Sequence, residues 1–541
     1  MKNILRRGRW LTGTTVAAAI LFAGCGNSDS FVFTNGASVV PAPVLSLPVA
    51  NNDAFNSLGN ATLNRTAANG VLSNDTLNGG EISSFDSVGT NGGALVLNAD
   101  GSLSYTPIFG FVGAESFNYT LTNTDGESTA TVTFTSTARG FFVDNTAPDG
   151  GNGSQAQPFD TLAEAIAAAA SGDTVFISRG NGTNTGLSGQ INLPPGVNLI
   201  GEGAGLVVAQ TIVPAGQAPV LQGPIVAGGN NVISGLTIQG SATYGVQVEN
   251  VSNVTVSDNT FSGPEDEHVF MVNIGGTVTI SGNTFEDPSD VGSDILDCEN
   301  TDTNGDLVIV DNIFRNDDGN SIDDLADIEP MGTSVMNITF SRNKANGVNP
   351  GDFSEGFYVD CAGTSRVTVT VEDNELSNFD DEVIGVHSRE DDSTISGSIT
   401  GNMFSDIFND NAIHAHLNGG TMAISGNMIT NANGSYMVLN VEDDGGTFIV
   451  ENNQFSGTGN SAIEFDDGSD TLETKMALRN NTVSGTFNDD FLLVWTGDAR
   501  FCLEIIGNTI VNQMTIVNDG AAGDFDVEQF NILSSINNGA T

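Results

Sequence analysis

The sequence predicts an all-β protein whose larger part is a solenoid of stacked strands, and two observations support this prediction. First, a phrase of alternating apolar residues, then Asn, any residue and a bulky apolar residue, returns ten times at intervals of 24 to 31 residues. A period of two is typical of strands, and such self-similarity is typical of stacked repeats. Second, the chain has 66 glycines but only 15 Lys and Arg. That composition favours strands and turns over helices.

The repeated asparagines are expected to be structural. A net hydrogen bond contributes about 0.5–1.5 kcal/mol, and an Asn in every turn can bond the turn backbone and the Asn of the next turn. Leu236 occupies the Asn place in GLTIQG, so we expect the ladder to begin at Asn259. The ten residues are Asn259, Asn283, Asn312, Asn343, Asn374, Asn402, Asn427, Asn453, Asn481 and Asn508.

Apolar residues recur at fixed phases around these asparagines and are predicted to stack inside the coil, where like residues of neighbouring turns meet. One phase holds Val256, Ile280, Val310 and Phe340, and a second holds Phe261, Phe285, Phe314, Phe404 and Phe455.

The chain is strongly acidic, with a formal charge of -51. Such a surface repels nucleic acid and anionic lipid and attracts cations. We therefore expect no nucleic-acid partner, and either a solvated surface or bound Ca²⁺. The solenoid also contains three cysteines, Cys298, Cys361 and Cys502. Two inward cysteines two turns apart lie roughly 9–10 Å apart, beyond disulfide reach, so we expect buried free thiols.

The start of the chain has the pattern of an export signal. A basic stretch, MKNILRRGRW, precedes a short apolar run that ends in LFAGC. The run is shorter than the about 20 residues that span a bilayer, and it fits a secretory signal. LFAGC resembles the lipobox of bacterial lipoproteins, which implies lipidation of Cys25, with Phe22 where Leu is usual. We expect a signal peptide at 1–24, a lipidated tether at 25–45, and a place in the bacterial cell envelope, the outer membrane being favoured by Gly26.

Short alternating runs broken by Asn-Asp and Gly predict a small β-sandwich over residues 46–138. The segments GVLSND (70–75), DGSLSYTP (100–107) and GFVGAESFNY (110–119) resemble bacterial cadherin-like and Ig-like modules. The resemblance implies a spacer or adhesive unit. It also implies core positions for Tyr105, Phe117 and Tyr119, and Ca²⁺ bound by Asp53, Asp75, Glu115 and Asp125.

Residues 139–541 begin with a segment that can close the end of a coil. Asp160 can cap a helix that starts near Thr161, and Leu162, Ala165, Ile166 and Ala169 share one face of it. This opening, with GDTVFI and LPPGVNLIGEG, resembles the N-terminal cap of right-handed parallel β-helices of the pectin-lyase-like superfamily. The resemblance runs on through the repeats and implies three strands per turn and about eleven or twelve turns.

Each turn carries a second strand after its Asn, in which alternate side chains face outward. Three of the four histidines and Arg389 are predicted to share this outer face. The predicted outward residues are Gln247, Asp297, Glu299, Asp323, Tyr358, Asp360, His387, Arg389, His414, His416, Asn440, Glu442, Glu464, Asp466 and Trp495.

In enzymes of the resembled superfamily this sheet forms the sugar cleft, which leaves several chemistries open. A lyase or epimerase needs a base and a cation, which His387, His414 or His416 and Arg389 or a bound Ca²⁺ can supply. The Ca²⁺ ligands would be Asp297, Glu299, Asp323 or Asp360. A hydrolase needs two carboxylates, from Asp297, Asp323 and Asp360. A transition metal on His414, His416 and a carboxylate is a third possibility.

No signature of one enzyme family is present, and outward polar residues also suit a binding surface. Tyr358, Asn440, Glu464 and Trp495 are candidates for contacts with sugar, because aromatic rings stack on sugar rings. The sequence thus predicts a monomeric, lipid-anchored surface protein that binds, and in one reading cleaves, extracellular polysaccharide. The alternative is a non-catalytic adhesin or scaffold.

Overall fold

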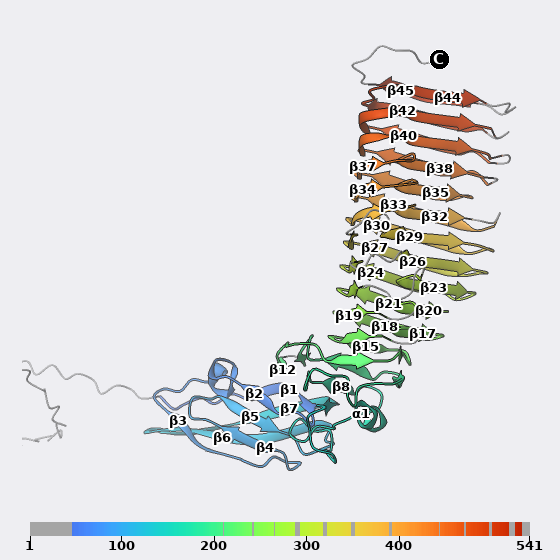
Figure 1. Cartoon of the computed structure of the whole chain (residues 1–541). Coiled ribbons are helices and arrows are strands. Elements are labelled where there is room, and N and C mark those ends of the chain that lie inside the picture. The colour runs from blue at the N-terminus through green and yellow to red at the C-terminus, as the bar shows by residue number, and fades with distance from the viewer. Residues whose placement is uncertain are drawn as a thin grey trace, which may run out of the picture. The chain divides into compact units, whose positions relative to one another are not determined.

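The computed structural model describes residues 46–208, 210–240, 243–263, 266–286, 293–316, 322–347, 352–388, 392–442, 444–469, 472–496, 500–518 and the backbone of 525–532. This part of the chain is nearly all β, with one α-helix (Figure 1). No helix in it has the length and apolar character needed to cross a membrane.

The first described region is a small sandwich of two sheets. Strands β1 and β3 pair with the long strands β6 and β7, and β4, β5 and β2 form a separate antiparallel sheet. Tyr105, Phe117 and Tyr119 are buried between the sheets, as predicted. The elements are β1 (Asp53–Gly59), β2 (Leu63–Arg65), two 3₁₀ turns (Ala67–Asn69 and Val71–Asn74), β3 (Glu81–Phe85), β4 (Ala94–Leu97), β5 (Leu103–Thr106), β6 (Gly113–Asn123) and β7 (Gly126–Val143).

Strand β7 continues past the sandwich and pairs in parallel with β8, the first strand of the coil. Between them the chain forms helix α1 (Leu162–Ala168), which is preceded by Thr161 as its N-cap residue. The cap is one residue later than the predicted Asp160, and the Thr161 hydroxyl bonds the Glu164 carboxylate at 2.8 Å. Leu162 and Ala165 pack on the solenoid core, so the predicted capping helix is confirmed.

The solenoid has about eleven turns that contribute a strand to each of three stacks of parallel strands, and two of the stacks extend beyond these turns by further strands (Figure 1). We call the stack whose strands lead into the repeated Asn the ladder stack, and it includes three strands before the one that leads into the first ladder Asn and one strand after the last ladder Asn. Its strands are β8 (Thr174–Ile177), β10 (Asn198–Gly201), β15 (Asn231–Ser234), β18 (Ser252–Ser257), β21 (Gly275–Ser281), β24 (Gly305–Val310), β27 (Val335–Ser341), β30 (Arg366–Glu372), β33 (Thr394–Thr400), β36 (Thr421–Ser425), β39 (Thr447–Glu451), β41 (Thr474–Arg479), β43 (Phe501–Asn508) and β45 (Phe525–Ile532).

The strands directly after the Asn form the short-strand stack. Its members are β13 (Val220–Gln222), β16 (Thr237–Gln239), β19 (Thr260–Ser262), β22 (Thr284–Glu286), β25 (Ile313–Arg315), β28 (Lys344–Asn346), β31 (Glu375–Phe379), β34 (Met403–Ile407), β37 (Met428–Ala432) and the first halves of β40 (Gln454–Asp467) and β42 (Thr482–Trp495).

The third set is the long-strand stack, which carries the candidate site. Its members are β9 (Ile191–Asn192), β14 (Ile225–Val226), β17 (Val246–Glu249), β20 (Val269–Val272), β23 (Leu296–Thr301), β26 (Ile322–Met331), β29 (Phe353–Cys361), β32 (Ile384–Ser388), β35 (Ile413–Leu417), β38 (Met437–Val441), the second halves of β40 and β42, and β44 (Met514–Asn518). A small antiparallel pair, β11 (Leu206–Val207) and β12 (Thr211–Val213), branches from the early coil.

The asparagine ladder is continuous, as predicted. Each ladder Asn is buried, and from Asn259 to Asn481 its backbone N–H and side-chain amide both donate to the next Asn, as Asn312 does to Asn343 Oδ1 at 3.0 and 3.1 Å. The ladder starts at Asn259, whose Oδ1 accepts the Leu236 N–H. The residue before each ladder Asn has a positive φ, for example Asp258 at 54° and Asp311 at 57°. Only Gly and short polar residues adopt this conformation routinely, which is why Gly, Asp and Asn dominate there.

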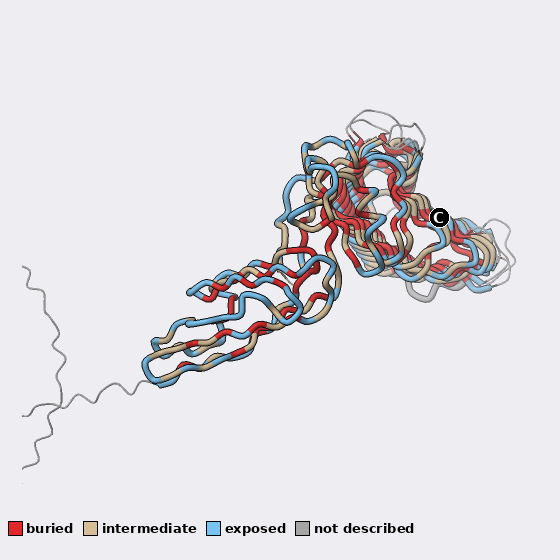
Figure 2. The backbone as a smooth tube through the Cα atoms, turned by 90° about the horizontal axis from the view of Figure 1, so that it is seen from below, coloured by how far each residue is buried: buried red, intermediate tan, exposed pale blue. Residues whose placement is uncertain are grey.

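The core of the coil consists of buried apolar residues that recur from turn to turn, and the backbone of buried residues is red in Figure 2. The rings of Phe261, Phe285 and Phe314 stack on one another at 5.0 and 5.2 Å, so this predicted phase is confirmed. The prediction that Val256, Ile280, Val310 and Phe340 stack inside the coil needs one correction. Ile309, not Val310, pairs with Ile280 and Phe340. Val310 is one residue further along the strand and therefore faces the other way. Cys298, Cys361 and Cys502 are buried and form no disulfide among the described residues, in agreement with the prediction.

Candidate functional site

Two columns of side chains face outward from the long-strand stack, because alternate residues of a strand point to opposite faces. Each column consists of residues that pair with one another across neighbouring strands of the stack. The first column contains Phe270, Asp297, Asp327, Tyr358, Gly385, His414, Val438 and Glu464. The second contains Glu299, Glu329, Asp360, His387, His416, Asn440 and Asp466. Neighbouring turns are about 4.8 Å apart, so each column is a continuous line of functional groups.

The histidines form one cluster on β32 and β35. His387 is close to both other imidazoles, with ring centroids 4.4 Å from His414 and 6.4 Å from His416. Tyr358 Oη lies 2.7 Å from His387 Nδ1. Burial, with the charges that His414 and His416 can carry, lowers the pKa of His387 to about 3. His387 is therefore a neutral imidazole at physiological pH and a weak base.

Glu382, in the turn before β32, holds two of these imidazoles. Its Oε1 lies 2.5 Å from His414 Nδ1, and its Oε2 lies 3.7 Å from His387 Nε2. The third imidazole faces a different carboxylate, with His416 Nε2 3.5 Å from Glu442 Oε2. Burial is the main cause that lowers the pKa of His416, and Glu442 opposes it. A carboxylate that accepts from an imidazole fixes the ring and its tautomer.

Gly385 makes this arrangement possible. It occupies the first column between Tyr358 and His414, where every neighbouring turn has a side chain. A Cβ on Gly385 would overlap the ring of Tyr358 and lie 3.1 Å from Glu382 Oε2. The missing side chain therefore leaves the space in which Tyr358 and Glu382 reach the imidazoles.

Next to the histidines, an acidic patch is formed by carboxylates in and just before β23 and by carboxylates of β26 and β29. Asp294, Asp324 and Asp327 each offer an oxygen within 4.8 Å of the others. Burial, with neighbouring carboxylates, raises the pKa of Asp294 to about 7 and that of Asp297 to about 8. Burial also raises the pKa of Asp324 and of Glu355, with Glu355 adding to the shift of Asp324. Several of these carboxyls therefore hold protons at neutral pH.

The structure places most of the predicted outward residues in the two columns, with two corrections. Asp323 is exposed and lies outside them, and Asp327 takes the place between Asp297 and Tyr358. The prediction for Asp323 was wrong because β26 is four residues longer than β23. The segment that pairs with β23 contains DIE (327–329), near the end of β26, whereas the prediction used SIDDLAD (321–327). The prediction that Trp495 faces outward is wrong: it is 2 % exposed, because it pairs with the buried Asp467 on the inward side. Arg389 and Cys25 lie outside the described residues.

Sequence reasoning missed Glu382 and Asp294, and it noted the acidic segment 317–329 without assigning Asp324 or Asp327 to the site. Asp327 carries a usable signal, since ADIE has the same alternation as LDCE in the preceding turn. Glu382 and Asp294 precede their strands, where no periodicity identifies the side chains that turn toward the columns.

The acidic residues expected to bind Ca²⁺ in the sandwich do not all meet. The carboxylates of Asp53 and Asp75 share the Tyr119 hydroxyl, at 3.1 and 2.9 Å. Glu115 is buried instead and accepts hydrogen bonds from the Gly93 N–H at 2.8 Å and the Tyr105 hydroxyl at 2.8 Å. Asp125 lies at the exposed β6–β7 turn. The structure therefore brings together only Asp53 and Asp75.

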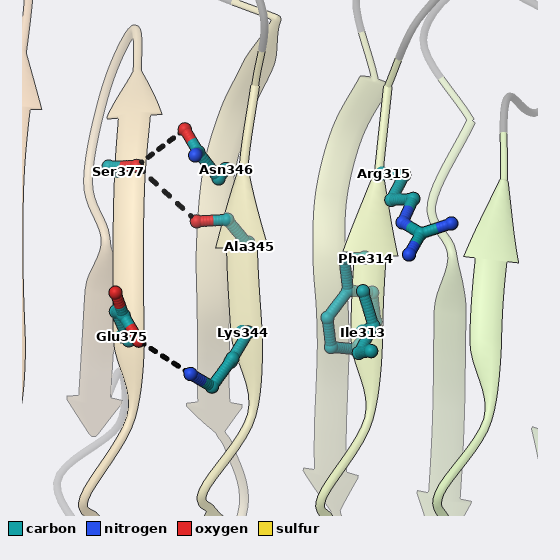
Figure 3. Close-up of a pocket in the computed structure, with 8 residues that line it drawn as sticks. All are labelled: Ile313, Phe314, Arg315, Lys344, Ala345, Asn346, Glu375 and Ser377. Carbon is teal, nitrogen blue, oxygen red and sulfur yellow. Dashed lines mark hydrogen bonds and ion pairs between the residues drawn. The ribbon is translucent and has the colours of Figure 1, made fainter.

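A shallow groove of about 390 Å³ lies on the short-strand stack (Figure 3). An ion pair of 2.7 Å joins Lys344 to Glu375 across it. A second ion pair of 3.1 Å joins Arg315 to Glu286. The charged groups that line the groove bind one another between turns, which is a structural role.

Two regions of the chain match models of known protein families. Residues 46–139 match the bacterial cadherin-like domain, and residues 222–397 match the right-handed beta helix region. The chain therefore combines a bacterial cadherin-like domain with a right-handed parallel β-helix. No curated protein matches the sequence at a significant level.

Three solved structures match this chain, each at low sequence identity and with a low TM-score. A rhamnogalacturonan lyase is 13 % identical, with a TM-score of 0.28, over 57 % of this chain and 82 % of that chain. A GH136 lacto-N-biosidase from Eubacterium ramulus is 10 % identical, with a TM-score of 0.32, over 73 % and 67 %. A family 28 exopolygalacturonase from Yersinia enterocolitica is 11 % identical, with a TM-score of 0.21, over 80 % and 85 %. Because these TM-scores are low, the activities of the three proteins do not indicate the chemistry of this chain, which depends on its own residues.

Proposed function

We propose that the long-strand stack binds an extracellular glycan along its two outward columns and hydrolyses it at the carboxylates of β23 and β26. The observation that supports this most is the order of the first column. An aromatic residue, Phe270, is followed by Asp297, Asp327 and the aromatic Tyr358 on successive turns. Aromatic faces on both sides of a carboxylate pair suit a sugar chain whose bond to be cleaved lies between them.

A second aromatic ring accompanies Phe270 at this end of the first column. Tyr244 stacks on Phe270 with ring centroids 4.4 Å apart and planes within 9° of parallel, and both side chains remain half-exposed. Beyond Tyr358 the columns continue with His414, Asn440 and Glu464, which can bond sugar hydroxyls. The face therefore provides stacking and hydrogen-bonding groups over several sugar units.

The raised pKa of Asp297 favours hydrolysis, and the lowered pKa of His387 makes that residue a poor base for elimination. A glycosidase needs one carboxyl that is protonated at working pH and a second carboxylate close to it. Asp297, with its pKa near 8, meets the first requirement, and Asp327 on the next turn is the second carboxylate. Elimination needs a base that takes a proton from carbon, and the pKa of about 3 makes His387 a poor one.

The charge of the chain narrows the substrate class. A net charge of -51 repels polyanions. We therefore infer a neutral glycan rather than a polyuronate, unless divalent cations bridge the two.

Reducing ends released from a panel of neutral and acidic glycans test the proposal. We expect release from neutral glycans, without the ultraviolet-absorbing unsaturated product of a lyase. Asp297→Asn should lower the rate by at least about tenfold, while Asp306→Asn, in the ladder stack of the same turn, should not. Activity should decline as pH rises through about 8, because deprotonation of Asp297 removes the acid. An unsaturated product, or an unaffected Asp297→Asn enzyme, would refute hydrolysis.

A non-catalytic adhesin is the second candidate, favoured by the length of the face. The columns extend from β20 to β40, further than one cleavage site requires. Binding without release of reducing ends on every glycan that binds would identify this function.

Attachment to the cell envelope is a separate part of the proposal. It rests on the LFAGC segment with Cys25. A fatty-acid analogue should label the full chain in bacterial cells but not the Cys25→Ser variant, and equal labelling of both would reject lipidation at this residue.

A further inference from the structure

Two imidazoles and one carboxylate converge on the surface of the long-strand stack. His387 on β32 and His414 on β35 belong to different columns of neighbouring turns, and Glu382 reaches both. Each of the three residues offers a donor atom within 4.8 Å of the other two. The chain has four histidines in all, so this concentration is not a property of its composition.

These donors suit one class of ion. Imidazole nitrogen is a ligand for Zn²⁺ and neighbouring transition metals, whereas Ca²⁺ and Mg²⁺ prefer oxygen alone. Two histidines with one glutamate are a common zinc ligand set, which leaves a position for water or substrate. The cluster therefore differs in kind from the all-carboxylate patch of Asp294, Asp324 and Asp327.

The surroundings hold the donors in place. His387 is only 9 % exposed, and among the residues that the structure describes its Nε2 has no hydrogen-bond partner. When Nδ1–H of His387 donates to Tyr358 Oη, the lone pair of Nε2 faces Glu382, which lies 3.7 Å away. Second-shell bonds of this type fix the tautomer of metal-binding histidines.

We propose that Glu382, His387 and His414 form a binding site for a divalent transition-metal ion of the Zn²⁺ class. The ion enters between the two imidazoles and replaces the proton that His414 Nδ1 shares with Glu382. His416 lies outside the donor set, because its Nε2 faces Glu442 at 3.5 Å and its ring is 6.4 Å from that of His387.

Co²⁺ titration of the full chain, purified without a polyhistidine tag, tests the proposal. Excess Ca²⁺ is present throughout, to saturate the carboxylates of this acidic surface. We expect one equivalent of Co²⁺ to give the visible absorption bands of a nitrogen-ligated ion, and Zn²⁺ to displace it stoichiometrically. His387→Ala, His414→Ala and Glu382→Gln should each weaken binding by at least about tenfold.

Matched controls separate the site from general effects. His416→Ala removes a histidine two residues from His414, and Glu375→Gln removes a carboxylate from the preceding strand, so both should bind Co²⁺ as the unaltered chain does. Circular dichroism establishes that each variant is folded, and an unfolded variant is replaced by His387→Gln or His414→Gln. Absence of stoichiometric binding in excess Ca²⁺, or an equal loss in His416→Ala, would overturn the proposal. Because no glycan is involved, this result is independent of hydrolysis.

Discussion

The asparagine ladder and the outward face of the long-strand stack follow the same spacing but use it differently. At Asn312 and Asn343 the ladder repeats one residue, and each buried side chain bonds the next. On the outward face the residue type changes along each column, as from Asp327 through Tyr358 to His414 in the first. The uniform interactions that hold the turns together therefore lie inside the coil. The outer face carries no such constraint, so its residues can differ from turn to turn and serve a function.

Removing a ladder residue should cause the largest effect. Asn343→Ala leaves the backbone N–H and side-chain amide of Asn312 without their acceptor inside the core. Each buried unsatisfied group costs about 1–3 kcal/mol, so we expect a loss of about 3 kcal/mol, measured as a lower urea midpoint. Asn440→Ala, in the second outward column, should cost under about 0.5 kcal/mol. Equal costs would show that the ladder does not hold the turns together.

A side chain at Gly385 tests whether every position on the outward face accepts substitution without loss of stability. Gly385→Ala introduces a Cβ that overlaps the ring of Tyr358. Overpacking of this kind costs about 1–3 kcal/mol, and displacement of Tyr358 should break its bond to His387. Thermal unfolding measures the first effect, and the imidazole ¹H–¹⁵N correlation of His387 measures the second. An unchanged correlation would mean that Gly385 has no part in shaping the cluster.

The acidic patch should make stability depend on pH. Its carboxyls have raised pKa values in the folded protein, about 7 for Asp294 and about 8 for Asp297, so the folded state binds more protons than the unfolded one. Their contribution is complete below about pH 4 and is lost as pH rises toward 8.

Asp324→Asn should therefore stabilise the protein at pH 8, by on the order of 1 kcal/mol, and have little effect at pH 4. The difference between the melting temperatures of the two proteins, followed across this range, isolates the patch from histidine titration. A difference that does not grow with pH would contradict the raised pKa of Asp324.

The smallest effect is expected at the groove of the short-strand stack. Lys344→Ala removes an exposed ion pair to Glu375, and such pairs contribute about 0.2–1 kcal/mol, less at high salt. Unfolding in low and high salt should differ slightly for the unaltered chain and not for the variant. A loss of several kcal/mol would mean that this groove has more than a structural role.

The sequence predicted the repeating parts well, because the spacing of periodic residues shows which side chains face the core and which face solvent. The spacing of the asparagines, the phase of Phe261 and Phe285, and the capping helix could all be read from alternation and turn residues. The common outer face of His387, His414 and His416 followed from the same alternation. Errors arose where the period changes, as at Asp323 in the longer strand β26 and at Trp495 near the last turns.

By itself the sequence determined the class of fold, the interior columns and the strands that carry the histidines, since a period of two assigns side chains to faces. Only the tertiary structure decided which groups touch. Glu382 comes from a turn without periodicity, and its approach to His387 and His414 depends on the space above Gly385. The raised pKa values of Asp294 and Asp297 depend on burial and on carboxylates of other turns. Distances between residues that are some thirty positions apart in the chain are set by the stacking of turns, which no local pattern contains.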